Sequence, residues 1–190
     1  HPFAIDQHAL ATVPDDLDGI EACLSPGVGT ISKFETECAE RGMDVYMADG
    51  SVDGPIGKHP RFRFIHRFIG AVTDEQTSTM DRWVRTSMQG SSGDLLLQMD
   101  IEGGEWEALL GMSHRLLARC RIIAVEMHGL DRLFLEGGFE LMRPTFDKLL
   151  FGHACVHIHP NNWEPVITHR GISVPRVAEF TFHRRDRLQE

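Results

Sequence analysis

Short apolar runs alternate with helix-like patterns along most of this sequence, and that alternation constrains the fold more than any other feature. Residues 95–99 are almost entirely apolar, as expected for a strand covered on both faces of a parallel sheet. Similar runs lie at residues 20–24, 45–48 and 121–125, and apolar residues recur at helical spacing between several of them. This order predicts an α/β domain with a mostly parallel sheet and helices on both faces.

Weaker patterns complete the prediction. Ser32 and Glu35 have the spacing of a capping box at the start of the helix after the first strand, and Gly42 ends that helix. A short link around residues 171–175 indicates that the last two strands pair as antiparallel neighbours. Further strands are expected over residues 62–69, 154–159 and 177–182, and helices over residues 77–88, 106–117 and 139–150.

Length and charge limit the class of protein. A chain of 190 residues fits one domain, with residues 1–17 as a lead-in segment, and a start at His1 rather than Met suits a domain excised from a larger polypeptide. The formal net charge of -9 argues against binding to nucleic-acid phosphates. The four cysteines form no Cys-x-x-Cys pair, and there is no signal peptide or transmembrane run. We therefore expect a reduced, cytoplasmic protein.

Two polar features follow the first two strands. Gly27-Val28-Gly29 comes directly after the first strand, and Asp49 ends the second. Glycines allow a sharp turn and a close ligand approach, and an acid after the second strand can accept hydrogen bonds from a ribose diol. The loop lacks both the full dinucleotide fingerprint and the Gly-Lys-Ser/Thr of a phosphate loop. The pattern therefore favours a nucleoside cofactor without a pyrophosphate, with a plain turn as the alternative.

Acids gather after the central strand and the strand that follows it. Asp100, Glu102 and Glu105 lie within six residues, and Glu126 and His128 end the next strand. If these strands are neighbours, their backbones lie roughly 5 Å apart, so Asp100 and Glu126 could bracket a Mg²⁺ or Mn²⁺ ion. His128 would be a third ligand or a general base. The alternatives are a hydrogen-bonded pair at the pocket floor and a solvated turn in which Glu105 caps the next helix.

A row of histidines marks the strand before the last. His153, Cys155, His157 and His159 alternate along it and so share one face, but neighbours on that face lie about 7 Å apart. That spacing is too wide for all four to share one zinc ion. At the end of the strand, residues 159–162 (His-Pro-Asn-Asn) offer amides that could hold polyol hydroxyls; a Pro-Asn turn is the alternative.

These segments together resemble the FkbM-type methyltransferases, a family in the class I S-adenosylmethionine-dependent group, over roughly residues 18–183. The most specific piece is LLLQMDIEGGEW at residues 95–106, where the family has a hydrophobic run, Asp-x-Glu-Gly, Ala or Gly, and then Glu. Residues 123–129 are similar to its next strand end, with Glu-x-His, and residues 157–162 to its late His-x-Asn-Asn segment. One departure is Ser25-Pro26, where many members have an acid before the glycine.

The resemblance implies a Rossmann-like, seven-stranded sheet with a reversed last strand. It also implies methyl transfer from S-adenosylmethionine to a hydroxyl, typically on a sugar of a glycan, glycolipid or natural product, with assistance from a divalent metal in related enzymes. The acceptor would be a small molecule or glycan, and fusion to glycosyltransferase domains would suit an excised piece. Two other functions stay open: a non-catalytic sugar-binding module of a glycosyltransferase polypeptide, and a nicotinamide-dependent oxidoreductase.

The predicted site has four groups of residues. We expect Asp100, His128 and His159 to be catalytic, and Asp100, Glu126 and His128 to hold the metal. We expect Glu102, Asn161 and Asn162 to bind the substrate. The cofactor would be bound by Ser25, Gly27, Gly29, Glu35, Asp49 and Ser51.

Overall fold

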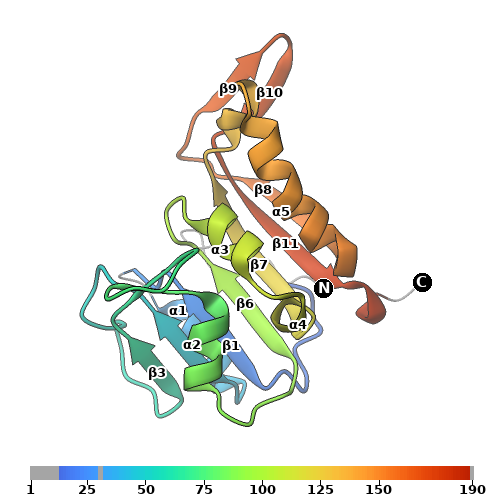
Figure 1. Ribbon diagram of the computed structural model, residues 1–190. Helices are drawn as coiled ribbons and strands as arrows, with labels where there is room; N and C mark the ends of the chain where they lie inside the picture. Colours follow the sequence, from blue (N-terminus) through green and yellow to red (C-terminus); the bar gives the residue numbers. More distant parts are fainter. Residues whose placement is uncertain (1–12, 30–31, 189–190) are drawn as a thin grey trace.

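The computed structural model describes residues 13–29 and 32–188, and its centre is a seven-stranded sheet (Figure 1). The strand order is β3-β2-β1-β6-β7-β11-β8, and β11 alone runs against the other strands. This order, with its reversed strand, confirms the predicted class I methyltransferase topology. The strands of the sheet are β1 (Ala22–Pro26), β2 (Asp44–Ala48), β3 (Phe62–Ile65), β6 (Leu95–Met99), β7 (Cys120–His128), β8 (His153–Pro160) and β11 (Val177–Arg184).

Helices cover both faces of the sheet, as predicted. Along β6 the side chains alternate: Leu95 and Leu97 pack with Trp83 on one face, and Leu96 packs with Phe34 on the other. All three leucines are fully buried, which explains why the run in the sequence is continuously apolar. Helix α1 (Lys33–Glu40) lies on the Phe34 face. The other face carries α2 (Met80–Ser87), α3 (Glu105–Gly111), α4 (His114–Leu117) and α5 (Gly138–Gly152). Short 3₁₀ turns cover Leu130–Phe134 and Arg185–Arg187.

The ends of four strands meet at one edge of the sheet, which we call the carboxyl edge. Ala48 of β2 lies opposite Pro26 of β1, and Met99 of β6 lies opposite Val125 of β7. The backbone N–H of Asp100 donates to the Pro26 carbonyl, which continues the pairing one step beyond the strands. The polar residues that follow β1, β2, β6 and β7 are therefore brought together at this edge.

The predicted third strand is too long. β3 ends at Ile65, and the chain turns there before a second short strand, β4 (Phe68–Ile69), which pairs with β5 (Thr77–Ser78) in a separate two-stranded sheet. The Phe68 ring lies against Gly50, where a Cβ would be 2.6 Å from the ring. The segment leaves the sheet to cover the loop after β2.

Three of the predicted helices differ in the structure, two of them because a capping side chain sets where a helix starts. The Thr79 hydroxyl accepts from the Arg82 N–H, so α2 starts at Met80 rather than at residue 77. The pattern over residues 106–117 splits into α3 and α4 because the Ser113 hydroxyl accepts from the Leu116 N–H and starts a new helix. The capping box is wrong: Ser32 makes no side-chain cap bond, and α1 ends at Glu40, close to the predicted stop at Gly42.

The late strands pair as predicted, but the link between them is not a short turn. β8 and β11 are antiparallel neighbours, and the residues between them form a hairpin of β9 (Val166–His169) and β10 (Ile172–Pro175). This hairpin projects beyond the sheet (Figure 1). Smaller differences affect strand ends, since β1 lies two residues later than predicted and β7 extends through Glu126 to His128.

Two further observations bear on the expectations from composition. All four cysteine thiols are free, and only Cys155 is exposed. Within residues 13–29 and 32–188, no helix is both long enough and apolar enough to cross a bilayer. Residues 1–12 of the predicted lead-in lie outside the described residues, and the single-domain assignment stays a prediction.

Candidate active site at the carboxyl edge

The Gly27 loop touches the strand that bears the acid cluster. Gly27 has a φ of +84°, and a Cβ on it would lie 1.5 Å from the backbone oxygen of Asp100. Only glycine tolerates both this conformation and this contact. The turn after β1 is therefore locked against the end of β6, and the two predicted ligand-binding segments are direct neighbours.

Asp49 organises the same loop. Its carboxylate accepts from the backbone N–H of Gly29 at 3.0 Å, from the backbone N–H of Ser51 at 2.7 Å and from the Ser51 hydroxyl at 2.6 Å. Burial raises the pKa of Asp49, but these hydrogen bonds outweigh it and leave the pKa below its ordinary value. The Asp49 carboxylate thus holds Gly29 and Ser51 in place, and all three are predicted cofactor residues.

Ser25 and Glu35 lie beneath the loop rather than on its surface. The Ser25 Oγ is 2.6 Å from Glu35 Oε1 and 2.9 Å from the side-chain oxygen of Gln98, and both predicted residues are buried. Burial raises the pKa of Glu35, and its Oε2 atom has no hydrogen-bond partner among the described residues. This pair supports the loop from below; a direct contact with the cofactor stays a prediction.

Among the acids of the carboxyl edge, Asp100 has the carboxylate with the fewest stabilising partners. Its Oδ1 atom is buried and has no hydrogen-bond partner in the part of the chain that the structure describes. Burial and the negative charge of Glu126 raise the pKa of Asp100 to about 7. The influence of Glu126 agrees with the predicted pairing across β6 and β7. A carboxylate with such a pKa can take up a proton near neutral pH.

His128 lies among four carboxylates. Its Nδ1 is 3.2 Å from Glu105 Oε1, while its Nε2 is 3.4 Å from Glu102 Oε2 and 3.8 Å from Glu126 Oε2. Burial alone would lower the pKa of His128, but Glu105, Asp100 and Glu126 raise it to about 9. The neighbouring carboxylates therefore favour the protonated ring, which is a charge partner for them; the predicted role of His128 as a base stays a prediction.

Glu105 is the site residue that sequence reasoning undervalued. Its side chain is fully buried, and its carboxylate accepts from the backbone N–H groups of Ile101 and Gly103 as well as contacting His128. The alternative of a solvated turn is therefore wrong for Glu105, although the residue does stabilise the turn before α3. The Trp106 indole N–H donates to the His128 carbonyl at 2.8 Å, which fixes the end of β7 against α3. The signal available in the sequence was Gly103-Gly104 before the acid, a turn tight enough to fold the carboxylate back on its own backbone.

The predicted substrate residues reach the same edge from two sides. Asn161 donates its amide N–H to Glu126 Oε1 at 2.9 Å. Asn162 Nδ2 is 3.4 Å from His159 Nε2, and Glu102 is largely exposed with a φ of +56°. His159 itself lies on β8, separated from β7 by β11, so the structure does not bring it into the Asp100 cluster.

The predicted metal ligands come together only in part. Among the described residues, the group of three ligand atoms that all lie within 4.8 Å of one another comes from Asp100, Glu105 and His128; Glu126 lies near His128 but is not part of this group. The Glu105 oxygens already accept backbone N–H bonds, and imidazole is a poorer ligand than carboxylate or water for Mg²⁺ and Mn²⁺. Of the predicted set, Asp100 alone presents an unpartnered buried oxygen. The donor set therefore does not fit a hard divalent cation.

Sequence comparison decides the family. Residues 10–151 match the model of the methyltransferase FkbM domain. The chain belongs to the FkbM methyltransferase family. It is an S-adenosylmethionine-dependent methyltransferase, and this replaces the two alternatives of a sugar-binding module and a nicotinamide-dependent oxidoreductase. The matched region of this FkbM methyltransferase contains Gly27, Asp49, Asp100 and His128 but ends before Asn161.

Two solved structures of other methyltransferases are more distantly similar to this chain. The magnesium protoporphyrin IX methyltransferase of Synechocystis PCC 6803, solved with bound SAH, is 12% identical, with a TM-score of 0.43; the match covers 89% of this chain and 75% of that one. A TehB-like SAM-dependent methyltransferase of Corynebacterium glutamicum ATCC 13032 Kitasato is 14% identical, with a TM-score of 0.42, and the match covers 90% of this chain and 84% of that one. No curated protein matches the sequence.

Proposed function

We propose that this methyltransferase acts on a hydroxyl group of a sugar, and that Asp100 accepts the hydroxyl proton. The observation that carries the proposal is the position of the Asp100 carboxylate. It has an unpartnered, buried oxygen, and its backbone touches the Gly27 loop. A base is thereby held next to the segment on which a nucleoside cofactor would lie.

The cofactor, when bound, supplies a methyl group on a sulfonium, which needs no further activation. With the cofactor bound, the hydroxyl oxygen would bond to the methyl carbon as the sulfur–carbon bond broke, and Asp100 would accept the hydroxyl proton. A pKa of about 7 keeps Asp100 largely ionised just above neutral pH and still basic enough to take the proton. Gly27 lets the loop pack directly against the backbone of Asp100, and Asp49 holds the loop in place.

The other residues of the carboxyl edge have positioning and substrate-binding roles in this proposal. His128 carries a positive charge that partly offsets Asp100, Glu105 and Glu126, and Glu105 fixes the ring through Nδ1. Glu102, Asn161 and Asn162 offer carboxylate and amide groups for sugar hydroxyls, and His159 orients Asn162. Such groups suit a polyol because each hydroxyl both donates and accepts a hydrogen bond.

The predicted Mg²⁺ or Mn²⁺ is not needed for this route. We expect protein dialysed against a chelator to retain its turnover, since Asp100 alone removes the proton. Loss of turnover that returns with added Mn²⁺ would instead support the predicted metal assistance.

Calorimetric titration with S-adenosylmethionine, followed by mass spectrometry of products over a glycan panel, tests the proposal. We expect cofactor binding and a mass increase of one methyl group on an oxygen of a sugar. Binding without transfer to any glycan would contradict the sugar acceptor, and transfer to nitrogen or sulfur would contradict the role of Asp100 as the base.

A further inference from the structure

The two outer strands of the sheet differ in how their outer sides are protected. β3 forms one end of the strand order, and the Arg63 guanidinium donates to the carbonyls of Pro60 and Phe62 at 2.6 and 2.9 Å. Beside it, Arg61 pairs with Asp44. Charged side chains on an outer strand, above all where they occupy backbone acceptors, hinder its pairing with another chain. β3 is therefore protected against a further strand.

β8 forms the other end of the strand order, and its sequence lacks the charges that protect β3. The strand is eight residues long, and within residues 13–29 and 32–188 it pairs with β11 alone. Residues 149–163 include no Asp, Glu, Lys or Arg, although these types make up 25% of the chain. The register with β11 shifts at Val156, which leaves regular strand on both sides of that residue. A long, uncharged outer strand of this kind is a surface on which another chain can pair.

Apolar side chains are exposed along β8 and at the end of α5, which leads directly into it. On β8, Val156 is 45% and Ile158 is 57% exposed, and on α5 Leu150 is 40% and Phe151 is 84% exposed. Because α5 packs against β8, we treat these four side chains and the outer side of β8 as one surface, the β8 strip (Figure 1). Exposed apolar side chains that gather beside an outer strand mark a surface that binds another molecule.

The lack of charge favours a second copy of this chain as the partner. The chain has a net charge of -9, so two copies repel one another wherever their acidic surfaces meet. In a two-fold contact, each residue near the axis lies beside its own counterpart, and any charge there meets an equal charge. A self-contact therefore requires an uncharged patch at its centre, and the β8 strip provides one. A different protein would impose no such requirement.

The size of the β8 strip sets the expected strength of the contact. An eight-residue strand is about 26 Å long, and a helix packed beside it makes the strip about 20 Å wide, so that its area is roughly 500 Å². Stable interfaces bury about 800 Å² on each partner, and smaller ones belong to weak, reversible complexes. The strip therefore predicts a dimer that forms and dissociates in the micromolar range of protein concentration.

We propose that two copies of this chain associate through the β8 strip, with β8 of one copy antiparallel to β8 of the other. The two central sheets would then be continuous, and Val156, near the middle of the strand, would lie close to the two-fold axis. The proposal does not depend on the acceptor of the methyl group, because the outer strand forms the strip and the Asp100 cluster does not.

Sedimentation velocity at protein concentrations from about 1 to 100 μM tests the association. We expect the mass to rise from 21.4 kDa toward twice that value. Val156→Lys places equal charges at the axis and should raise the dissociation constant at least tenfold. Val72→Lys is the matched control and should leave the constant unchanged, because Val72 is 64% exposed in the segment between β4 and β5. A wild type that is monomeric throughout would overturn the proposal, and so would equal dimerisation of both variants.

Charge exchange and hydrogen exchange locate the contact. A mixture of Val156→Lys and Val156→Glu should form a heterodimer as readily as the wild type dimerises, because opposite charges then meet at the axis. In the wild type, which needs no folding control, the amides of β8 should exchange more slowly as the protein concentration rises, whereas those of β3 should not. A mixture that stays monomeric, or β8 amides whose exchange is independent of concentration, would contradict pairing through β8.

Discussion

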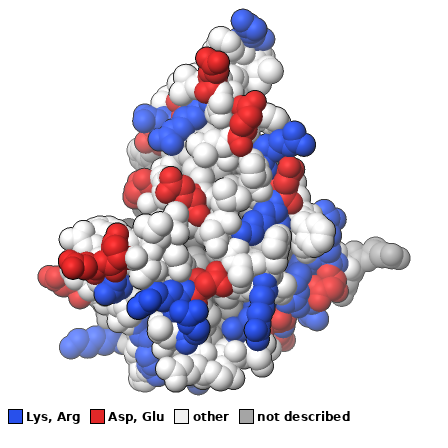
Figure 2. Space-filling model, in the orientation of Figure 1, with Lys and Arg blue, Asp and Glu red and all other residues white. Residues whose placement is uncertain are grey.

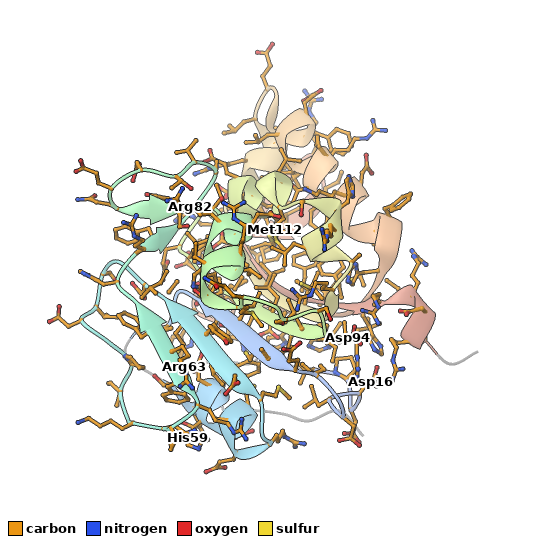
Figure 3. The ribbon with its side chains drawn as sticks, turned by 60° about the horizontal axis from the view of Figure 1, so that its bottom comes forward. Asp16, His59, Arg63, Arg82, Asp94 and Met112 are labelled. Carbon is orange, nitrogen blue, oxygen red and sulfur yellow. The ribbon has the colours of Figure 1, made fainter. Side chains whose placement is uncertain are left out.

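The two edges of the sheet hold acids of opposite character. At the edge away from the site, two acids face guanidinium groups: Asp94 lies 2.8 Å from Arg121 and 2.7 Å from Arg184, and Asp16 lies 2.6 Å from Arg187. Asp16 and Asp94 lie close to the same end of the molecule in Figure 3. Their hydrogen bonds with Arg187 and Arg184, respectively, are the main reason that both acids have a pKa below the ordinary value.

At the carboxyl edge, acids outnumber cations. Asp100, Glu102, Glu105 and Glu126 share the one ring of His128, and the pKa of Asp100 rises instead of falling. Elsewhere on the face shown in Figure 2, positive and negative side chains are interspersed. The difference teaches that paired charges at one edge stabilise the fold, whereas the unpartnered Asp100 carboxylate at the other costs stability and provides reactivity.

Asp100→Asn should give the largest effect. We expect kcat to fall by about 10²–10⁴-fold, because the amide cannot accept the hydroxyl proton. The raised pKa means that ionised Asp100 destabilises the fold increasingly as the pH rises from about 4 to 7. At pH 8 the variant should therefore be more stable, by roughly 1–3 kcal/mol. Turnover assays measure kcat, and urea unfolding measures the stability. Calorimetry measures the affinity for the cofactor, which should not change.

Asp94→Asn is the matched control at the other edge. It should lower stability and leave kcat unchanged, because Asp94 loses its ion pairs with Arg121 and Arg184. If both variants changed stability in the same direction, the two edges would not differ as described.

Arg121→Met should have the next largest effect, on stability alone. The side chain is 7% exposed and bridges Asp16 and Asp94, so its loss removes one buried ion pair from each acid and leaves Asp94 with Arg184 and Asp16 with Arg187. We expect a loss of about 3 kcal/mol in the free energy of unfolding. Arg61→Met, which removes an exposed pair with Asp44, should cost less than about 1 kcal/mol. Equal losses in both variants would contradict the importance of burial at this edge.

Glu105→Gln should give the smallest effect, a change in one pKa. Glu105 contributes most of the stabilisation of the His128 imidazolium, so its neutralisation should lower the pKa of His128 from about 9 toward 6.5. A raised histidine pKa adds stability below about pH 6.5 that is lost as the pH rises through 9, and the variant should lack this dependence. Titration of the assigned His128 resonance by NMR measures the shift. An unchanged pKa would show that Glu105 does not set the charge of His128.

The sequence predicted the strands of the sheet and the edge where the site lies, because continuous apolar runs and the polar residues after them are local signals. Asp100, Gly27 and Asp49 were found in this way. The place of Glu105 depends on a turn that folds its carboxylate onto Ile101 and Gly103, which spacing alone does not show. The break after Ile65 accompanies the pairing of β4 with β5 and the contact between Phe68 and Gly50, which join segments that no local pattern connects.

The dependence of kcat/KM on pH tests the role of Asp100 most directly. Because Asp100 must be ionised to accept the proton, kcat/KM should rise with pH and level off through an apparent pKa near 7. A value of kcat/KM that stays constant from pH 5.5 to 8 would contradict Asp100 as the base.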